Sequence, residues 1–374
     1  MKIVVVAGAR PNFMKVAPLV EALKSCQATR PDLEILLVHT GQHYDARMSR
    51  AFFNHLELPV PDVELEVGSG THAEQTGRVM IAFERLLFER KADWVVVVGD
   101  VNSTVACALT AKKLGIKVAH VEAGLRSRDW TMPEEINRVV TDVLCDALFT
   151  TDPIASENLV REGMARAKIH FVGNVMIDTL LKHRESARSL AYYSRFGLKP
   201  GDYAVLTLHR PSNVDDVGSF SHILDALARI AGRLPIVFPV HPRTRKMAQA
   251  FGLWERLDSL PNMHLLEPLG YLEMLSLTAS ARMILTDSGG LQEEAVVLGI
   301  PCVTLRDNTE RPVTIEVGSN RLVGNDPDLI AQVVNELLSN GHRQIRTPDK
   351  WDGRAAERIV RTLLLEHEDL IHLR

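Results

Sequence analysis

Short runs of Val, Ile and Leu recur along the whole chain and predict buried β-strands. They include KIVVVAG, LEILLVHTG and DWVVVVGD in the first part of the chain, and YAVLTLHR, IVFPVHPR and RMILTDSGG in the second. The runs are continuously apolar rather than alternating, which is typical of strands that are covered on both faces. We therefore expect parallel β-sheets.

The segments between these runs have the spacing of amphipathic helices. AEQTGRVMIAFERLLFER repeats apolar residues every three or four positions, and INRVVTDVLCDAL does so at Ile136, Val139, Val140, Val143 and Leu144. Alternation of strand and helix indicates an α/β protein. Right-handed crossovers then place helices on both sides of each sheet.

The length of 374 residues favours two domains, because it exceeds what one hydrophobic core usually serves. A charged helical segment follows the strand pattern near Val172, which suggests a boundary there. We predict two Rossmann-like domains facing across a cleft, over residues 1–172 and 173–353. A helix predicted over 354–374 could pack on either half, and we place it on the first.

Composition narrows the classes of function. A net charge of -4 argues against a protein that coats nucleic acid, since such proteins usually carry a basic face. The four cysteines lack CxxC spacing, which favours free, buried thiols. The first apolar run is too short for a signal peptide or a membrane span. We expect a cytoplasmic protein with no nucleic-acid or membrane partner.

Polar residues cluster where the predicted strands end. Ligands of open parallel sheets bind beyond the carboxyl ends of the strands, so these residues mark a candidate binding site. They are Arg10, Lys15, His43, Asp100, Glu122, His209, Arg210, His241, Arg243 and Ser288.

The segment TDSGGLQEEAV resembles an anion cradle at the start of a helix. Ser288, Gly289 and Gly290 would leave backbone N–H groups open to a phosphate, favoured by the helix dipole. Ordinary helix capping explains Ser-Gly-Gly about as well. Glu294 is a candidate contact for ribose hydroxyls, although Glu293 and Glu294 could also simply favour the helix N-terminus.

Basic residues supply further candidate contacts to an anionic ligand. Arg10 and Lys15 follow the first strand, where they could grip a phosphate or remain surface charges. His209, Arg210 and His241 are equivalent candidates in the second half. The first strand ends in GARPNFMK rather than GxGxxG, which disfavours NAD, HExxH is absent, and no Asp-x-Asp directly follows a predicted strand to hold a metal-bound diphosphate.

Carboxylates gather in the stretch between residues 100 and 135. Asp100 and Glu122 end strands, and Glu134 begins a helix, so the three could converge. Crowded carboxylates raise one another's pKa, which leaves one as an acid and another as a base. Ion pairing with Arg138 is the alternative, since this residue lies one helical turn from Glu134 and Glu135. That pairing would account for the presence of one of the two glutamates, but not for Asp100 and Glu122.

Together, GARPNFMKVAPL, TGQHYD, GDVNST, HVEAGLRSRDWTMPEEINR, HRPSN, DSGGLQEEA and RDNTERPVTIEVGSNRLVG resemble the non-hydrolysing UDP-N-acetylglucosamine 2-epimerases over most of the chain. The resemblance implies a glycosyltransferase-B fold, a homodimer, a UDP-sugar substrate, and neither cofactor nor metal. It also implies elimination of UDP through 2-acetamidoglucal and its re-addition after proton delivery to the opposite face of C2.

The resemblance implies roles for individual residues. Asp100, Glu122 and Glu134 are the acid/base candidates, and His209 would lie near the diphosphate. The candidate substrate contacts are Arg10, Lys15, His43, Arg210, His241, Ser288, Gly289, Gly290, Glu294 and Arg311. Four alternatives stay open: an epimerase of a UDP-diacetamido uronic acid, a hydrolysing epimerase, a UDP-sugar glycosyltransferase, and an inert nucleotide-sugar sensor.

Overall fold

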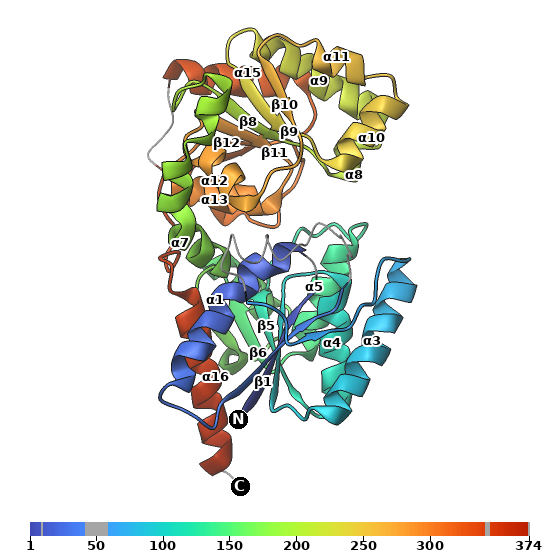
Figure 1. Ribbon diagram of the computed structural model, residues 1–374, viewed down its shortest axis with the longest axis vertical. Helices are drawn as coiled ribbons and strands as arrows, with labels where there is room; N and C mark the ends of the chain where they lie inside the picture. Colours follow the sequence, from blue (N-terminus) through green and yellow to red (C-terminus); the bar gives the residue numbers. More distant parts are fainter. Residues whose placement is uncertain (9, 42–58, 341–344, 373–374) are drawn as a thin grey trace. The chain divides into compact units, whose positions relative to one another are not determined.

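The computed structural model describes residues 1–8, 10–41, 59–340 and 345–372 (Figure 1). The chain forms two compact units, Met1–Thr179 with Asp349–Arg374, and Leu180–Pro348. The division falls within helix α7 (Val175–Leu190). The first turn of α7 belongs to the first unit, because the Thr179 hydroxyl donates a hydrogen bond to the Met14 carbonyl.

The first unit contains a seven-stranded parallel sheet of order β3-β2-β1-β4-β5-β6-β7. Strands β4 and β6 are fully buried, and β1 and β5 are buried except for their first residues, as their continuous apolar sequences predict. The order reverses between β1 and β4, so the carboxyl ends of these strands form the switch point at which α/β sheets bind ligands. The strands are β1 (Lys2–Ala7), β2 (Glu34–His39), β3 (Val63–Glu64), β4 (Trp94–Val98), β5 (Lys117–Ala123), β6 (Ala147–Thr150) and β7 (Ile169–Phe171).

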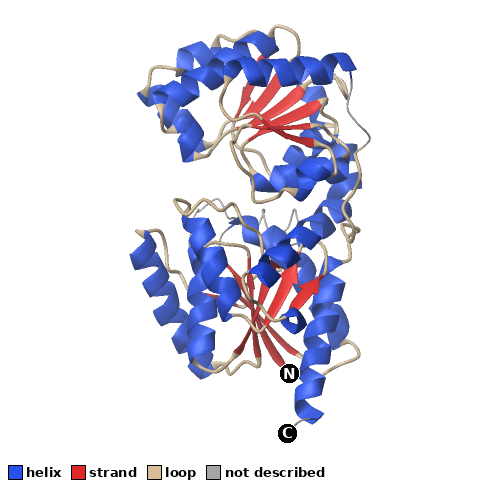
Figure 2. Cartoon of the chain, turned by 180° about the vertical axis from the view of Figure 1, so that it is seen from behind, coloured by secondary structure: helices blue, strands red, loops and turns tan. Residues whose placement is uncertain are grey.

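Helices cover both faces of this sheet (Figure 2). Helices α1 and α16 pack together on one side, and α3, α4 and α5 lie side by side on the other (Figure 1). Thr71 and Glu74 form a capping box that fixes the start of α3. The helices of the unit are α1 (Arg10–Gln27), α3 (His72–Glu89), α4 (Asn102–Lys113), α5 (Pro133–Leu144), α6 (Pro153–Arg161) and α16 (Ala355–His372), with a 3₁₀ turn at Arg166–Lys168.

The second unit repeats this architecture with a six-stranded parallel sheet of order β10-β9-β8-β11-β12-β13. Its switch point lies between β8 and β11. The strands are β8 (Ala204–Thr207), β9 (Ile236–Pro239), β10 (Met263–Leu266), β11 (Met283–Thr286), β12 (Cys302–Thr304) and β13 (Asn320–Leu322). The helices are α8 (Pro211–Val214), α9 (Val217–Ala231), α10 (Pro242–Ala250), α11 (Trp254–Asp258), α12 (Tyr271–Ala279), α13 (Gly289–Leu298), α14 (Val313–Glu316) and α15 (Pro327–Asn340), with a 3₁₀ turn at Tyr192–Phe196. Two Rossmann-like parallel sheets confirm the predicted α/β fold class.

Helix α5 exists as predicted, but its apolar stripe does not face the core. Ile136, Val140 and Val143 are 45%, 40% and 59% exposed. The buried face of the helix is polar instead, and carries Glu135, Arg138, Thr141 and Asp142. An amphipathic pattern normally directs its apolar side inward. Here the ion pairs of the buried residues decide the orientation.

Helix α16 is held against the first unit by a buried carboxylate. Asp178, on α7, accepts hydrogen bonds from the backbone N–H groups of Ala355 and Ala356 at 3.1 and 2.8 Å. These groups lie in the first turn of α16, where backbone donors have no partner within the helix. The Trp351 indole donates to the Thr151 carbonyl at 2.9 Å and fixes the preceding segment.

We expect Asp178→Ala to cost about 1–2 kcal/mol of unfolding free energy at pH 5, because two N–H groups lose their acceptor. Burial raises the pKa of Asp178 from 3.8 to about 6. The folded state therefore binds this proton more tightly than the unfolded chain does. The contribution of Asp178 is fully present below about pH 4 and declines as the pH rises through 6. Urea unfolding at pH 5 and pH 8 should show the smaller loss at pH 8.

Glu357→Ala is the matched control, since this exposed carboxylate in the first turn of the same helix pairs with Arg354 at 2.9 Å. An exposed pair contributes little, so the expected loss is below about 0.5 kcal/mol at both pH values. Equal losses for the two variants would contradict the role of Asp178.

Candidate functional site

Glu122 has an unusual backbone conformation at the end of β5. Its φ is 71°, and the pairing of β5 with β6 is irregular between Val121 and Ala123. A residue with a Cβ atom rarely adopts this left-handed conformation, which costs about 1–3 kcal/mol. Such strain persists only where the surroundings impose it. Glu122 is therefore held in place by its neighbours rather than by its own preference.

The carboxylate of Glu122 is buried beside a lysine. Its Oε2 atom forms an ion pair with Nζ of Lys15 on α1. A Cβ atom added to Gly99 would lie 3.4 Å from Nζ of Lys15 and 3.5 Å from Oε2 of Glu122, so these groups pack against the end of β4. The Oε1 atom is buried and has no hydrogen-bond partner among the described residues. One oxygen of Glu122 is thus paired, and the other has no partner in the described part of the chain.

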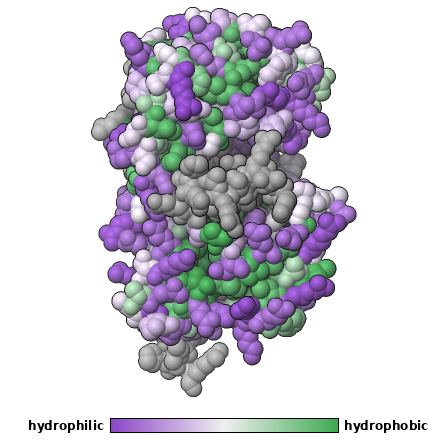
Figure 3. All heavy atoms as spheres, in the orientation of Figure 1, coloured by the Kyte–Doolittle hydropathy of each residue, from purple (hydrophilic) through white to green (hydrophobic). Residues whose placement is uncertain are grey.

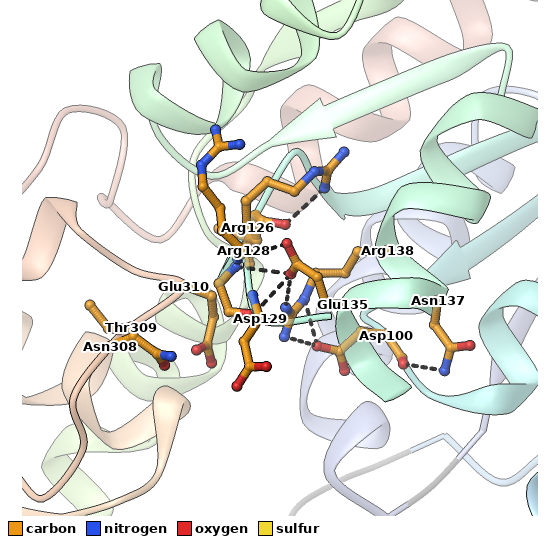
Figure 4. A network of polar contacts seen from close by, with 12 residues as sticks. Asp100, Arg126, Arg128, Asp129, Glu135, Asn137, Arg138, Asn308, Thr309 and Glu310 are labelled. Atoms are coloured by element: carbon orange, nitrogen blue, oxygen red, sulfur yellow. Dashed lines mark hydrogen bonds and ion pairs between the residues drawn. The ribbon is translucent and has the colours of Figure 1, made fainter. Parts of the chain in front are cut away.

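Asp100 follows β4 and is held by α5. Its Oδ2 atom accepts hydrogen bonds from Nη2 and Nε of Arg138 at 2.7 and 3.0 Å. Asn137 donates to the Asp100 carbonyl at 2.9 Å. Figure 4 shows Asp100, Glu135 and Arg138 pointing toward one another. Ion pairing with Arg138 therefore extends to Asp100, which the sequence argument had excluded.

The two adjacent glutamates of α5 have different environments. Glu135 is buried and accepts hydrogen bonds from the backbone N–H groups of Ser127 and Arg128, both at 2.9 Å, and from Arg138 at 2.7 Å. These contacts fix the loop that precedes α5. Glu134 is half-buried in the first turn of the same helix. Of the two glutamates that the sequence offered as partners of Arg138, Glu135 is thus the one that pairs with it.

Of two further predicted residues, one adjoins a gap in the described ranges and the other lies inside such a gap. Arg10 is the first residue of α1, which follows β1 at the switch point. His43 lies outside the described residues. The predicted contacts of Arg10 and His43 with a ligand stay predictions.

The second unit places a buried carboxylate, Asp287, at the end of β11. Its Oδ2 atom accepts hydrogen bonds from the backbone N–H groups of His209 and Arg210 at 2.9 and 2.8 Å, and from Nδ2 of Asn213 at 3.2 Å. Its Oδ1 atom lies 2.8 Å from Nδ1 of His209. Burial alone would raise the pKa of Asp287, but His209 and the backbone N–H groups together lower it. Sequence analysis missed Asp287, although an acidic residue directly after an apolar strand was the available signal.

His209 and His241 lie next to each other at the ends of β8 and β9. Their ring centroids are 5.7 Å apart. Nδ1 of His241 accepts a hydrogen bond from the Arg243 backbone N–H at 3.2 Å, at the start of α10. Burial lowers the pKa of His241, and the nearby His209 lowers it further. A neutral His241 that accepts at Nδ1 carries its hydrogen on Nε2, where it can donate to a ligand.

Helix α13 begins at the predicted anion cradle. Ser288 occupies the N-cap position, but its side chain makes no capping hydrogen bond. The ordinary-capping explanation is therefore weakened. A Cβ atom on Gly289 would lie 2.5 Å from Oε1 of Glu310 and 2.6 Å from Nη1 of Arg311, whereas Gly290 has open space around it. The first glycine allows close packing of the charged side chains, and the second leaves the helix start uncovered.

A buried cluster of charges lies beside the start of α13. Arg311 Nε is 2.8 Å from Glu293 Oε1, and Arg311 Nη1 donates to Glu310 Oε1 at 2.5 Å. Arg306 lies 2.8 Å from Glu310, and Arg210 lies 3.8 Å from it. The cluster joins three arginines to two glutamates. The excess of positive charge adds to the helix dipole and favours a bound anion.

Glu294 is buried on α13. Burial raises its pKa to about 7, and the charge of Glu293 adds to this, while the hydroxyl of Tyr271 opposes it. A carboxyl group of this kind can either donate or accept a hydrogen bond near neutral pH. Contact with ribose hydroxyls stays a prediction for this residue.

The described part of the chain contains neither a candidate metal site nor a candidate membrane-spanning helix. Its His, Cys, Asp and Glu side chains form no group of three that could hold a metal ion. None of its helices is both long and apolar enough to cross a membrane. Cys107, Cys145 and Cys302 are buried free thiols, and Cys26 is partly exposed.

We expect Glu135→Ala to lower the free energy of unfolding by about 3 kcal/mol, because Arg138 keeps Asp100 but loses its charge partner on α5, and the backbone N–H groups of Ser127 and Arg128 lose their acceptor. Glu134→Ala is the matched control from the adjacent position. It should change stability by less than about 0.5 kcal/mol. Urea unfolding of both variants checks this, and similar losses would contradict the assigned environments.

Comparison with known proteins gives one consistent result. A family model described as UDP-N-acetylglucosamine 2-epimerase matches residues 24–364. The chain is 44% identical over 368 residues to the UDP-N-acetylglucosamine 2-epimerase of Methanocaldococcus jannaschii, covering 97% of this chain and 99% of the relative. It is also 44% identical over 342 residues to the UDP-2,3-diacetamido-2,3-dideoxy-D-glucuronate 2-epimerase of Pseudomonas aeruginosa, covering 90% and 92%.

A solved structure agrees with the sequence comparisons. The crystal structure of the Methanocaldococcus jannaschii UDP-GlcNAc 2-epimerase in complex with UDP-GlcNAc and UDP has a TM-score of 0.89 to this chain. The two are 44% identical, and the match covers 98% of this chain and 100% of the other. The fold class, the family match and the relatives therefore agree, and this chain belongs to the UDP-N-acetylglucosamine 2-epimerase family.

Proposed function

We propose that the protein catalyses the reversible 2-epimerisation of UDP-N-acetylglucosamine to UDP-N-acetylmannosamine. The observation that carries this proposal is Glu122, a buried carboxylate in a strained backbone, with one oxygen paired to Lys15 and the other without a partner among the described residues. Strain of this kind gathers at active sites, where it fixes a reacting group. The solved relative bound to UDP-GlcNAc and UDP supports the choice of substrate.

The reaction consists of an elimination followed by an addition. A carboxylate removes the proton at C2 of the sugar while the C1–O bond breaks, and UDP leaves with the electron pair of that bond. The intermediate is 2-acetamidoglucal. UDP then re-adds at C1, and an acid delivers a proton to the opposite face of C2. Proton transfer at two faces requires more than one acid/base group. Asp100, Glu122 and Glu134 are our candidates.

The second unit carries the groups suited to the leaving diphosphate. Ser288, Gly289 and Gly290 offer the start of α13, and Arg311 belongs to the adjacent charge cluster. His209 is oriented by Asp287 and would donate to a phosphate oxygen as charge develops there. The remaining proposed contacts to the UDP-sugar are Arg10, Lys15, His43, Arg210, His241 and Glu294. The proposed reaction needs no cofactor, because the proton removed and the proton returned leave the oxidation state unchanged.

A second candidate is the same reaction on a modified sugar. The Pseudomonas aeruginosa relative, named for a UDP-diacetamido-dideoxy-glucuronate, is 44% identical to this chain, as is the relative named for UDP-N-acetylglucosamine. Overall identity therefore does not separate the two substrates. A parallel assay with both sugars decides between them through the ratio of their kcat/KM values.

Incubation with UDP-N-acetylglucosamine in deuterated water tests the proposed reaction. We expect NMR to show UDP-N-acetylmannosamine carrying deuterium at C2, because the base exchanges its proton with solvent between removal and return. Free N-acetylmannosamine with UDP would indicate the hydrolysing reaction instead. Unchanged substrate with retained UDP binding would favour a sensor, and transfer to an acceptor would favour a glycosyltransferase.

Substitution of the proposed acid/base residues tests their roles in the same assay. Glu122→Gln, Asp100→Asn and Glu134→Gln should each lower kcat by about 10²–10⁴-fold, the usual effect of removing a general acid or base. Glu157→Gln, an exposed change on α6, is the control and should leave kcat within twofold. A variant that retains the wild-type rate is excluded from the proton transfers.

We also propose that the exposed apolar side of α3 and α5 pairs with a second copy of the chain. Ile81 and Phe88 on α3 are exposed, as are Ile136, Val140 and Val143 on α5, and α4 lies between these helices. Figure 3 shows hydrophobic residues among hydrophilic ones on the surface of this unit. Exposed apolar patches mark interaction surfaces, and a twofold dimer brings the same patch of each copy together.

Val143→Glu should shift the mass measured by light scattering from two chains to one, because twofold symmetry places two added charges at the interface. Leu329→Glu, at an exposed apolar residue on α15, is the control and should leave the mass unchanged. A dimer that survives Val143→Glu at low micromolar concentration would contradict the assigned surface.

A further inference from the structure

We propose that His120 and Asp142 are positioning residues that hold Glu122 in the geometry required for proton transfer, through the backbone at Gly99 and Gly124. The inference rests on the proposed function, which names Glu122 and Asp100 as acid/base groups but gives His120 and Asp142 no role.

His120 connects the ends of three elements. It lies on β5, is fully buried, and its Nδ1 atom is 2.6 Å from Oδ1 of Asp142 on α5. Its Nε2 atom is 2.8 Å from the carbonyl oxygen of Gly99, directly after β4. A carbonyl oxygen accepts hydrogen bonds and cannot donate them, so Nε2 carries a hydrogen. A further hydrogen lies between Nδ1 and Asp142. Both ring nitrogens are thus engaged, and the ring cannot rotate without breaking a hydrogen bond.

Asp142 extends the connection to the other side of Glu122. Its Oδ2 atom accepts a hydrogen bond from the Gly124 backbone N–H at 3.1 Å and lies 2.7 Å from Nη2 of Arg126. Gly124 has a φ of 80°, and a Cβ atom there would lie 2.3 Å from the Ala155 carbonyl oxygen. The backbone after Glu122 is therefore pinned on one side by α6 and on the other by Asp142.

Arg126, which contacts Asp142, is itself held in place. The guanidinium of Arg126 donates from Nε and Nη2 to the two carboxylate oxygens of Glu162, at 2.9 and 2.6 Å, and from Nη1 to the Leu125 carbonyl at 2.8 Å. The charged groups around the His120–Asp142 pair are thus Arg126 and Glu162. A bidentate pair of this kind has a defined geometry. Asp142 is held against Gly124 by a rigid partner rather than by a flexible side chain.

These contacts grip the backbone on both sides of the strained residue. The Gly99 carbonyl bonded to His120 belongs to the glycine that packs against the Glu122 carboxylate, and the Gly124 N–H bonded to Asp142 lies two residues beyond Glu122. A φ of 71° at Glu122 relaxes unless both sides are held. Misplacement of a reacting group by about 1 Å can cost about 10²-fold in rate. The pair would thereby act on catalysis without touching the substrate.

His120→Leu and His120→Gln test this in the full-length enzyme. A leucine has a volume similar to that of histidine but forms neither the hydrogen bond to Asp142 nor the one to the Gly99 carbonyl. A glutamine keeps a donor that can reach the Gly99 carbonyl. We expect kcat of His120→Leu to fall about 10²-fold while KM stays within about threefold, and His120→Gln to regain about tenfold of that loss. His170→Leu is the control: it removes a partly buried histidine of the same sheet that pairs with Glu366, and it should leave kcat within twofold.

A double-mutant cycle separates positioning from general support of the fold. If His120 acts through Glu122, His120→Leu should lower the residual rate of Glu122→Gln by less than about threefold, because the group being positioned is already absent. The full 10²-fold loss in that background would overturn the proposal. A wild-type rate in His120→Leu would overturn it as well.

The test also separates this inference from the proposed function. A wild-type enzyme that incorporates no deuterium into either candidate sugar contradicts the proposed function and the positioning role together. An active wild-type enzyme whose His120 variants behave like His170→Leu contradicts the positioning role alone.

Discussion

The strained backbone of Glu122 is the constraint around which the first unit is organised. A glutamate at a φ of 71° needs support that its own conformational preference does not give. Lys15 holds the carboxylate, and the neighbouring turns at Gly99 and Gly124 are held by His120 and Asp142. Buried charges of this number are costly to desolvate, and the cost is offset only where each has a partner. Their concentration at one edge of the sheet indicates a site rather than a core.

In the second unit, a buried aspartate likewise fixes a histidine and the backbone beside it. Asp287 ends β11 and accepts hydrogen bonds from two backbone N–H groups after β8, so it joins the two strands that flank the switch point. Its contact with His209 orients a ring that can meet an anion. In both units a buried aspartate connects a histidine to the backbone beside the proposed reacting or binding groups. The shared topology places these connections at equivalent edges of the two sheets.

Helix α5 shows how ion pairing can override hydrophobic patterning. Three of its inward residues contact other parts of the first unit. Glu135 binds the loop before the helix, Arg138 binds Asp100, and Asp142 binds His120. Ile136, Val140 and Val143 are left exposed, and they belong to the surface proposed to meet a second chain. The orientation that serves the site and the surface proposed for dimerisation are therefore two sides of one helix.

The sequence by itself determined the architecture and placed candidate site residues at the ends of strands. Continuous apolar strands, helical spacing between them and long motifs predicted two parallel α/β sheets, which the structure has, and placed Glu122 and His209 at strand ends. These features follow from local patterns, because the period of the side chains and the position of a residue after a strand can be read along the chain. The family was equally evident from those motifs.

The tertiary structure alone decided which charges pair and which helix face turns inward. Arg138 lies one turn from both Glu134 and Glu135, yet it binds Glu135 and the distant Asp100. Asp287 and His120 form their hydrogen bonds with residues far away in the sequence, Arg210 and Gly99. Ion pairing depends on distances of a few ångströms between separate elements. The hydrophobic pattern of a single element does not predict these distances.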